Sequence, residues 1–127
     1  MSASLAVQKA VVAALADLPG LNGVFDGPPA EAAAPYAVIG PDLVSDWGSK
    51  TETGHATRLA VTIWDDRPGA ARLRALLGLA EARLRGLAGV HNDQRIVLVN
   101  LLRSGVGVAQ DGWRPGSIEI RVFTHAL

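Results

Sequence analysis

Three histidines are the side chains best suited to bind a metal ion or to move a proton near neutral pH. They are His55, His91 and His125, and each belongs to a different segment of the chain. None is paired at the spacing of a zinc-binding helix such as H-E-x-x-H, which presents two imidazoles on one face. The chain has no cysteine, so thiolate metal sites and disulfides are excluded. We therefore predict no metal site and interpret the histidines as polar residues of loops and strand ends.

Two further patterns could bind phosphate or catalyse a reaction. The segment 104–112 (SGVGVAQDG) contains G-x-G, but Gln110 replaces the third glycine and no first strand-helix unit precedes it. A phosphate cradle needs the glycines and a helix N-terminus together. The acidic pair Asp65 and Asp66 is explained by capping of a following helix. Without a G-x-S-x-G elbow or a P-loop, we predict a protein that is not an enzyme and uses no cofactor.

Tryptophans in polar loops are the most unusual feature of this aromatic-poor chain. Trp47 and Trp113 both stand in glycine-flanked loops, whereas Trp64 ends a predicted strand. A loop tryptophan either packs back on its own subunit or contacts another chain, because tryptophan is enriched in interface hot spots. Several basic residues also lie outside the predicted core and are either solvated or part of a basic surface: Lys50, Arg58, Arg103, Arg114 and Arg121.

Two amphipathic helices are predicted to support these loops. The first runs from about Ser4 to Leu18 and stops at Pro19 and Gly20. The second follows Asp65 and Asp66, which are predicted to cap it, with Pro68 in its first turn. Its apolar residues recur at helical spacing, which predicts one buried face: Leu73, Leu76, Leu77, Ala80, Leu84 and Leu87.

Five segments read as strands. A short strand is expected at Val24 and Phe25, and 36–43 and 58–64 form a hairpin joined by the polar, projecting connection 45–56. Gly40 and Pro41 predict a bulge or a sheet edge. The nearly continuous apolar run 94–102 (QRIVLVNLL) predicts a central strand covered on both faces. Residues 117–124 alternate between apolar and polar, as a half-exposed strand does.

This order of elements predicts an α+β fold. We expect a single domain over 1–127, with a mixed, mostly antiparallel sheet of four to five strands and two helices packed on one face. The strand-helix-strand crossover between 58 and 102 allows one parallel pair.

The charge balance argues against general binding to polyanions. Twelve basic and twelve acidic residues cancel, so contact with DNA would have to come from a local patch. No segment reaches the roughly 20 apolar residues that span a bilayer, so we predict a soluble protein with no membrane partner.

Three segments, taken in order, resemble the tail-terminator (tail-completion, head-tail joining) proteins of long-tailed phages and phage-derived gene transfer agents. The first is the alanine-rich N-terminal helix leading to VFDGPPAEAAAPYAVIG, and the second is DWGSKTETGHATRLAVTIWDD. The third is the pair of strands around DGWRPGSIEIRVF. The resemblance covers nearly the whole chain.

The resemblance implies a structural role in a virion. Members form a hexameric ring that caps the tail tube, stops its polymerisation and joins it to the head connector or stopper protein, while DNA passes through the channel without specific binding. It places the protein in the tail of a virion or phage-like particle made in a bacterial cytoplasm. The residues implied in contacts with neighbouring subunits or the tube are Trp47, Lys50 and Thr51 in one loop, and Trp113 and Arg114 in another.

Two other classes of function stay open at this stage. A small-ligand binding or regulatory α+β module would have the same pattern of elements, and it predicts a deep apolar pocket with convergent polar groups. A hydrolase or transferase would need serine, aspartate and histidine side chains to converge in space.

Overall fold

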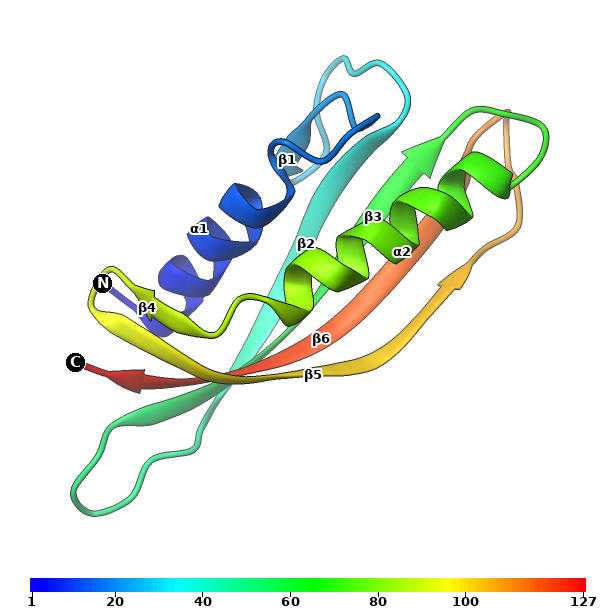
Figure 1. The fold of residues 1–127 in the computed structure, drawn as a ribbon. Helices are drawn as coiled ribbons and strands as arrows, with labels where there is room; N and C mark the ends of the chain where they lie inside the picture. The colour runs from blue at the N-terminus through cyan, green and yellow to red at the C-terminus, as the bar shows by residue number, and fades with distance from the viewer.

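One curled sheet carries two helices on the same face (Figure 1). The computed structural model describes all residues from 1 to 127. Its elements are α1 (Ala3–Leu15), β1 (Val24–Asp26), β2 (Tyr36–Asp46), β3 (Gly54–Asp65), α2 (Ala71–Arg85), β4 (Gly89–His91), β5 (Gln94–Val106) and β6 (Arg114–Ala126). The strand order is β1-β2-β3-β6-β5-β4. The predicted α+β class and the placement of both helices on one face are confirmed. The sheet has six strands rather than four to five, and the strand that was not predicted is the short β4.

Helix α1 begins at a side-chain cap and ends earlier than predicted. The hydroxyl of Ser2 accepts a hydrogen bond from the Leu5 N–H at 3.1 Å, which satisfies one free amide of the first turn. The helix ends at Leu15 and not at Leu18, although Leu18 is still buried. Gly20 then adopts φ +86°, a left-handed conformation that glycine tolerates without strain.

Strand β6 lies at the centre of the sheet between β3 and β5. Its alternation is as predicted: Ile118, Ile120 and Val122 are buried beneath the helices, while Glu119 and Arg121 point to the opposite, open face. Together with the inward residues of β2, β3 and both helices they form one core cluster of 20 buried residues. At Gly116 a Cβ would lie 2.8 Å from Leu77 Cδ1, so this glycine lets α2 approach the sheet closely.

The predicted parallel pair across the strand-helix-strand crossover does not form. Strand β6 inserts between β3 and β5 and is antiparallel to both, so β3 and β5 run in the same direction without being neighbours. The parallel pair of the sheet is instead β1 with β2. Hydrogen bonding to an antiparallel strand is at least as favourable as to a parallel one, and the β5–β6 turn brings β6 back beside β5 at once.

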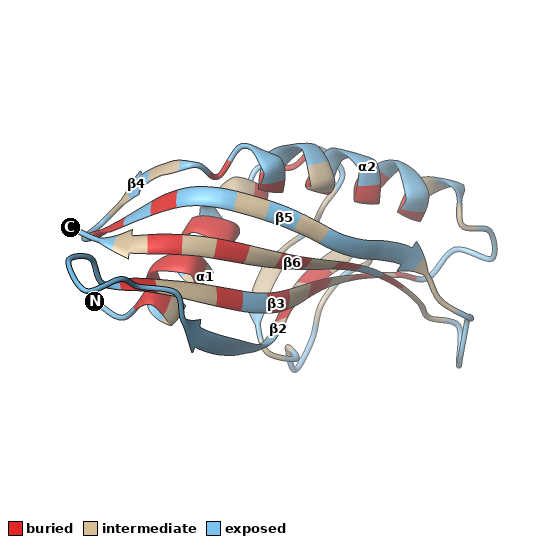
Figure 2. Ribbon diagram, turned by 90° about the horizontal axis from the view of Figure 1, so that it is seen from below, coloured by how far each residue is buried: buried red, intermediate tan, exposed pale blue.

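Strand β5 was predicted to be covered on both faces, and this prediction is wrong. Only Gln94 and Ile96 of β5 are buried, and the exposed fraction of Leu98 is 48%. Figure 2 shows β5 mostly in pale blue beside the red bands of β6. The helices cover one side of β5, and no second layer covers the other, so its apolar residues stay partly in contact with solvent.

The β2–β3 hairpin is longer than predicted. Pairing continues to Asp46 and His55, so the expected connection 45–56 shrinks to a turn over 47–53. The ladder is irregular between Ile39 and Asp42, which confirms the bulge predicted at Gly40 and Pro41. The paired strands carry the turn beyond the helices at one end of the molecule (Figure 1).

Helix α2 starts after the predicted cap. Its N-cap position is Ala70, with no side-chain hydrogen bond, and Pro68 precedes the helix rather than lying in its first turn. Asp65 and Asp66 therefore do not cap the helix. All six residues of the predicted apolar stripe are buried, although Leu87 lies beyond the end of α2 at Arg85.

Candidate assembly surfaces

Trp47 in the β2–β3 turn packs on the open face of the sheet. Its indole stacks on the imidazole of His125, with centroids 4.9 Å apart and planes 18° apart, and lies 4.8 Å from the ring of Phe123. Glu52 completes the cluster, since its Oε2 lies 3.1 Å from His125 Nδ1. The exposed fraction of Trp47 is still 41%. The tryptophan thus holds the turn against its own subunit and also offers an aromatic surface to another chain.

Glycines permit this tight turn. A Cβ at Gly54 would lie 2.9 Å from His125 Cδ2 and 3.3 Å from Trp47 Cε3, and a Cβ at Gly48 would lie 2.6 Å from the Glu52 carbonyl oxygen. Both spaces are closed to larger residues. The packing of the aromatic cluster therefore depends on glycine at these two positions.

Lys50 and Thr51 occupy the tip of the turn and are exposed. The Thr51 N–H donates to the hydroxyl of Ser49 at 3.3 Å, which shapes the turn locally. Lys50 takes part in no ion pair. The Thr51 hydroxyl also lies 3.4 Å from the Ser49 hydroxyl, so Lys50 is the side chain of the tip that is free to meet a partner.

The second predicted contact loop packs against its own subunit at the other end of the sheet. The ring of Trp113 meets that of Tyr36 edge-on at 5.7 Å, and both residues are half-buried. Arg114 donates to the carbonyl oxygens of Gly107 at 3.2 Å and Pro68 at 3.3 Å. Strand β3 separates the two loops, because it pairs with His125 at one end and with Arg114 at the other.

The open face of the sheet carries a cluster of arginines around one glutamate. Glu119 Oε2 accepts a hydrogen bond from Arg103 Nε at 2.7 Å, and Glu119 Oε1 pairs with Arg58. Arg103 and Arg58 together hold the pKa of the Glu119 carboxyl below its usual value. Arg121 lies next to this cluster, opposite Arg58 in the ladder, and makes no ion pair. Three of the five predicted basic residues therefore share one face, which one carboxylate partly neutralises.

The three histidines make separate contacts. His91 contacts the Leu87 carbonyl oxygen at 2.6 Å, His125 belongs to the Trp47 cluster, and the Nδ1 of His55 is buried without a partner. No three of the histidine and carboxylate side chains are arranged to hold a metal ion.

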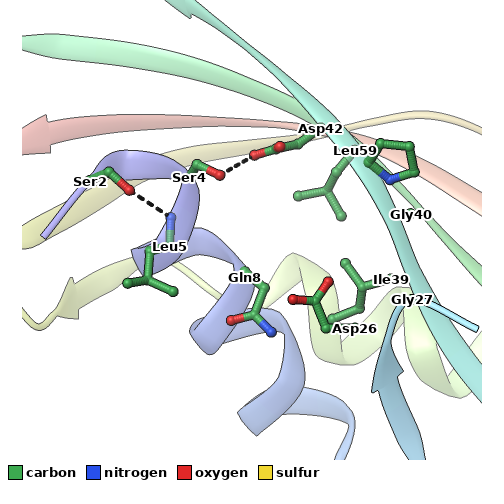
Figure 3. Close-up of a pocket in the computed structure, with 11 residues that line it drawn as sticks. Ser2, Ser4, Leu5, Gln8, Asp26, Gly27, Ile39, Gly40, Asp42 and Leu59 are labelled. Carbon is green, nitrogen blue, oxygen red and sulfur yellow. Dashed lines mark hydrogen bonds between the residues drawn. The ribbon is translucent and has the colours of Figure 1, made fainter. Parts of the chain in front are cut away.

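A hollow of ≈ 320 Å³ lies between the start of α1 and the β1–β2 edge (Figure 3). Asp26 and Asp42 line it from the strands, and Ser4 and Gln8 line it from the helix. The Ser4 hydroxyl pairs with Asp42 Oδ2 at 2.5 Å. This polar and partly open hollow differs from the deep apolar pocket that a small-ligand module predicts.

Sequence reasoning allowed for a sheet edge in β2, at Gly40 and Pro41, but missed the uncovered edge at β5. Leu43 has an exposed fraction of 76% on β2, and Leu98 of 48% on β5. Both leucines point to the open face, which no second layer covers, and the short outer strands β1 and β4 leave the backbone beside them unpaired.

The profile of the family described as tail completion protein gp17 matches residues 3–125, which is nearly the whole chain. The chain belongs to the tail completion protein gp17 family. The family resemblance predicted from the sequence is therefore confirmed. Membership makes this tail completion protein a structural component of a phage-type tail.

Solved structures share the fold of this tail completion protein. One similar chain comes from the virion of a native gene transfer agent (GTA) particle, with a TM-score of 0.75 and 22% sequence identity. The alignment covers 98% of this chain and 96% of that one, so the two folds correspond along their whole length. No curated protein sequence gives a significant match. Neither α1 nor α2 has the length and apolar character that a membrane span requires.

Proposed function

We propose that this protein is a non-enzymatic tail subunit that forms a ring of six on the end of the tail tube. The ring stops addition of further tube subunits and presents a surface to the head connector or stopper protein. The particle is a phage or a gene transfer agent. Membership of the tail completion family is the observation that carries this proposal.

The architecture supports assembly around an axis. A ring needs a heterologous interface, in which one surface of a subunit meets a different surface of the next. The sheet has two different edges, β2 and β5, that its outer strands leave largely uncovered. The projecting β2–β3 turn, with Trp47, Lys50 and Thr51, is the proposed contact to neighbours or to the tube, and the loop at Trp113 and Arg114 is the second.

The charge distribution supports passage of DNA without retention. Glu119 engages both Arg58 and Arg103, so it partly neutralises the arginine cluster of the open face, and Arg121 is the member left without an ion pair. Strong non-specific binding needs many lysine and arginine contacts to the backbone. We therefore propose that DNA passes through the channel of the ring without specific binding.

The test is a length assay with the cognate tube protein. Tubes polymerised with this protein present should stop at a fixed length and show a ring at one end by electron microscopy. Tubes assembled without it provide the control for uncapped growth. Tubes that keep growing, with no density on their ends, contradict the proposal.

A further inference from the structure

The two long sheet edges lack outer partners over most of their length. Strand β1 pairs only with residues 37–39 of β2, and β4 pairs only with residues 94–96 of β5. Residues 40–46 of β2 and 97–106 of β5 therefore have no strand on their outer side. An uncovered edge is a template for pairing with another chain.

Both edges expose an aliphatic side chain on the same face of the sheet. Leu43 pairs with Arg58 and Leu98 pairs with Phe123, which places both leucines on the open face. Their exposed fractions of 76% and 48% leave apolar surface in water. Burying these two side chains against each other would remove that surface from solvent.

The helix side of the β2 edge is acidic. Asp26 and Asp42 pair in the ladders with Ile39 and Leu59, whose side chains face the helices. Their carboxylates line the hollow beside α1 (Figure 3), and neither forms an ion pair. Strand β2 as a whole carries Asp42 and Asp46 and no basic residue.

The helix side of the β5 edge carries a net positive charge. Arg83 of α2 faces α1, because its Nη1 lies 2.6 Å from Asp17 Oδ1. At 3.6 residues per turn, Arg74 and Arg85 lie on the flank of α2 opposite Arg83, away from α1, with Glu81 between them. Figure 1 shows β5 on that side of α2, where the two arginines outweigh the single glutamate. Both arginines are exposed and neither forms an ion pair.

The strand directions allow these edges to meet. Three antiparallel steps separate β2 from β5 in the sheet, so the two strands are antiparallel to each other. When copies are related by rotation about an axis along the strands, β2 of one copy runs antiparallel to β5 of the next. The junction then repeats the antiparallel relationship of the ladders inside each sheet.

We infer that the β2 edge of one copy, at 42–46, docks head to tail on the β5 edge of the next copy, at 98–101. Leu43 meets Leu98 on the open face, and Asp26 and Asp42 face Arg74 and Arg85 of the neighbour on the helix side. This inference rests on the proposed ring and names its repeating contact. Complementary charge sets the orientation, and apolar burial at the leucines adds affinity.

Irregular ladders limit how far the pairing extends. Strand β5 is irregular at Val97 and at Leu102, and β2 is irregular between Ile39 and Asp42. The regular stretches are 42–46, which follows the irregularity in β2, and 98–101, which lies between the two irregularities in β5. Bulges at edges disfavour indefinite strand pairing. Short regular stretches therefore favour a defined junction over open-ended aggregation.

The test uses two charge-reversed variants. One carries Asp26→Arg with Asp42→Arg, and the other carries Arg74→Glu with Arg85→Glu. Each variant alone places like charges at every junction, so we expect its self-association to fall at least tenfold. Mixed in equal amounts, the two variants can alternate around a ring, which places opposite charges at every junction, so rings should form again. Analytical ultracentrifugation measures assembly of the free chain, and electron microscopy measures it on tube ends.

Controls separate this inference from the proposed function. Circular dichroism and thermal unfolding must show that both variants fold, and Arg67→Glu, an exposed charge off both edges, should assemble as the wild type does. If both variants cap tubes and associate like the wild type, the edge junction is wrong and the capping function stands. If the mixture fails while each variant is folded, these charge pairs do not face each other. A wild-type chain that neither associates nor caps tubes overturns both proposals.

Discussion

Asp65, the last residue of β3, binds Arg72 in the first turn of α2. Arg72 Nε donates to Asp65 Oδ2 at 3.0 Å, and Arg72 Nη2 donates to Asp65 Oδ1. The Asp66 N–H also donates to Asp65 Oδ1, at 2.9 Å. The Asp65 side chain is almost fully buried, so the pair fixes the entry of α2 onto the sheet without capping the helix.

We expect Asp65→Asn to lower the free energy of unfolding by about 2 kcal/mol, because it weakens two charge-assisted hydrogen bonds to Arg72. Urea denaturation followed by circular dichroism measures the loss. Asp66→Asn is the matched control, since Asp66 is exposed and its Oδ1 lies 3.5 Å from Arg72 Nη2. Equal losses in the two variants would show that the buried pair is not special.

Acidification should destabilise the protein through its paired carboxyls. Hydrogen bonds from Arg72 hold the pKa of Asp65 below its ordinary value of 3.8, and Arg103 and Arg58 do the same for Glu119. A carboxyl whose pKa is lower in the folded state than in the unfolded state stabilises the fold. This stabilisation is complete above the unfolded-state pKa and is lost as the pH falls through the folded-state pKa. Thermal unfolding between about pH 7 and pH 2 should show a falling Tm below about pH 4, with a shallower fall in Asp65→Asn. A Tm that stays constant to pH 2 contradicts this.

Gly116→Ala should destabilise by roughly 1–3 kcal/mol, because the added methyl overpacks the contact between β6 and α2. The new Cβ would lie 2.8 Å from Leu77 Cδ1 and 3.0 Å from Leu73 Cδ1, and both leucines are buried. Gly105→Ala on the neighbouring strand is the control, since nothing lies within 4 Å of its Cβ position. Unfolding free energies from urea titration compare the two, and a neutral Gly116→Ala would mean that α2 shifts at little cost.

Lys50→Glu tests the turn as a functional contact. The side chain is exposed and unpaired, so we expect wild-type stability but tube capping weakened on the order of tenfold. Capping is scored as the protein concentration that gives half of the tubes a fixed length. Arg67→Glu, at the other end of the sheet, is the control and should cap normally. Unchanged capping by Lys50→Glu removes the tip of the turn from the interface.

Local pattern was enough to predict most of the elements. The alternation of Ile118, Ile120 and Val122 with polar residues predicts β6, and the leucines of α2 predict its buried face, because side-chain direction follows the period of each element. Gly40 and Pro41 likewise predict the bulge in β2, since a proline cannot donate to a ladder.

Contacts between distant segments decided what the pattern could not. An apolar run such as 94–102 has the same sequence pattern whether a second layer of the protein covers it or one of its faces is exposed. The exposure of Leu98 therefore could not be predicted from the sequence. The placement of β6 between β3 and β5 and the stacking of Trp47 on His125 both join segments that are far apart in the sequence. Periodicity determines which face of each strand is apolar, whereas the choice of neighbour depends on the total burial and hydrogen bonding of the assembled sheet.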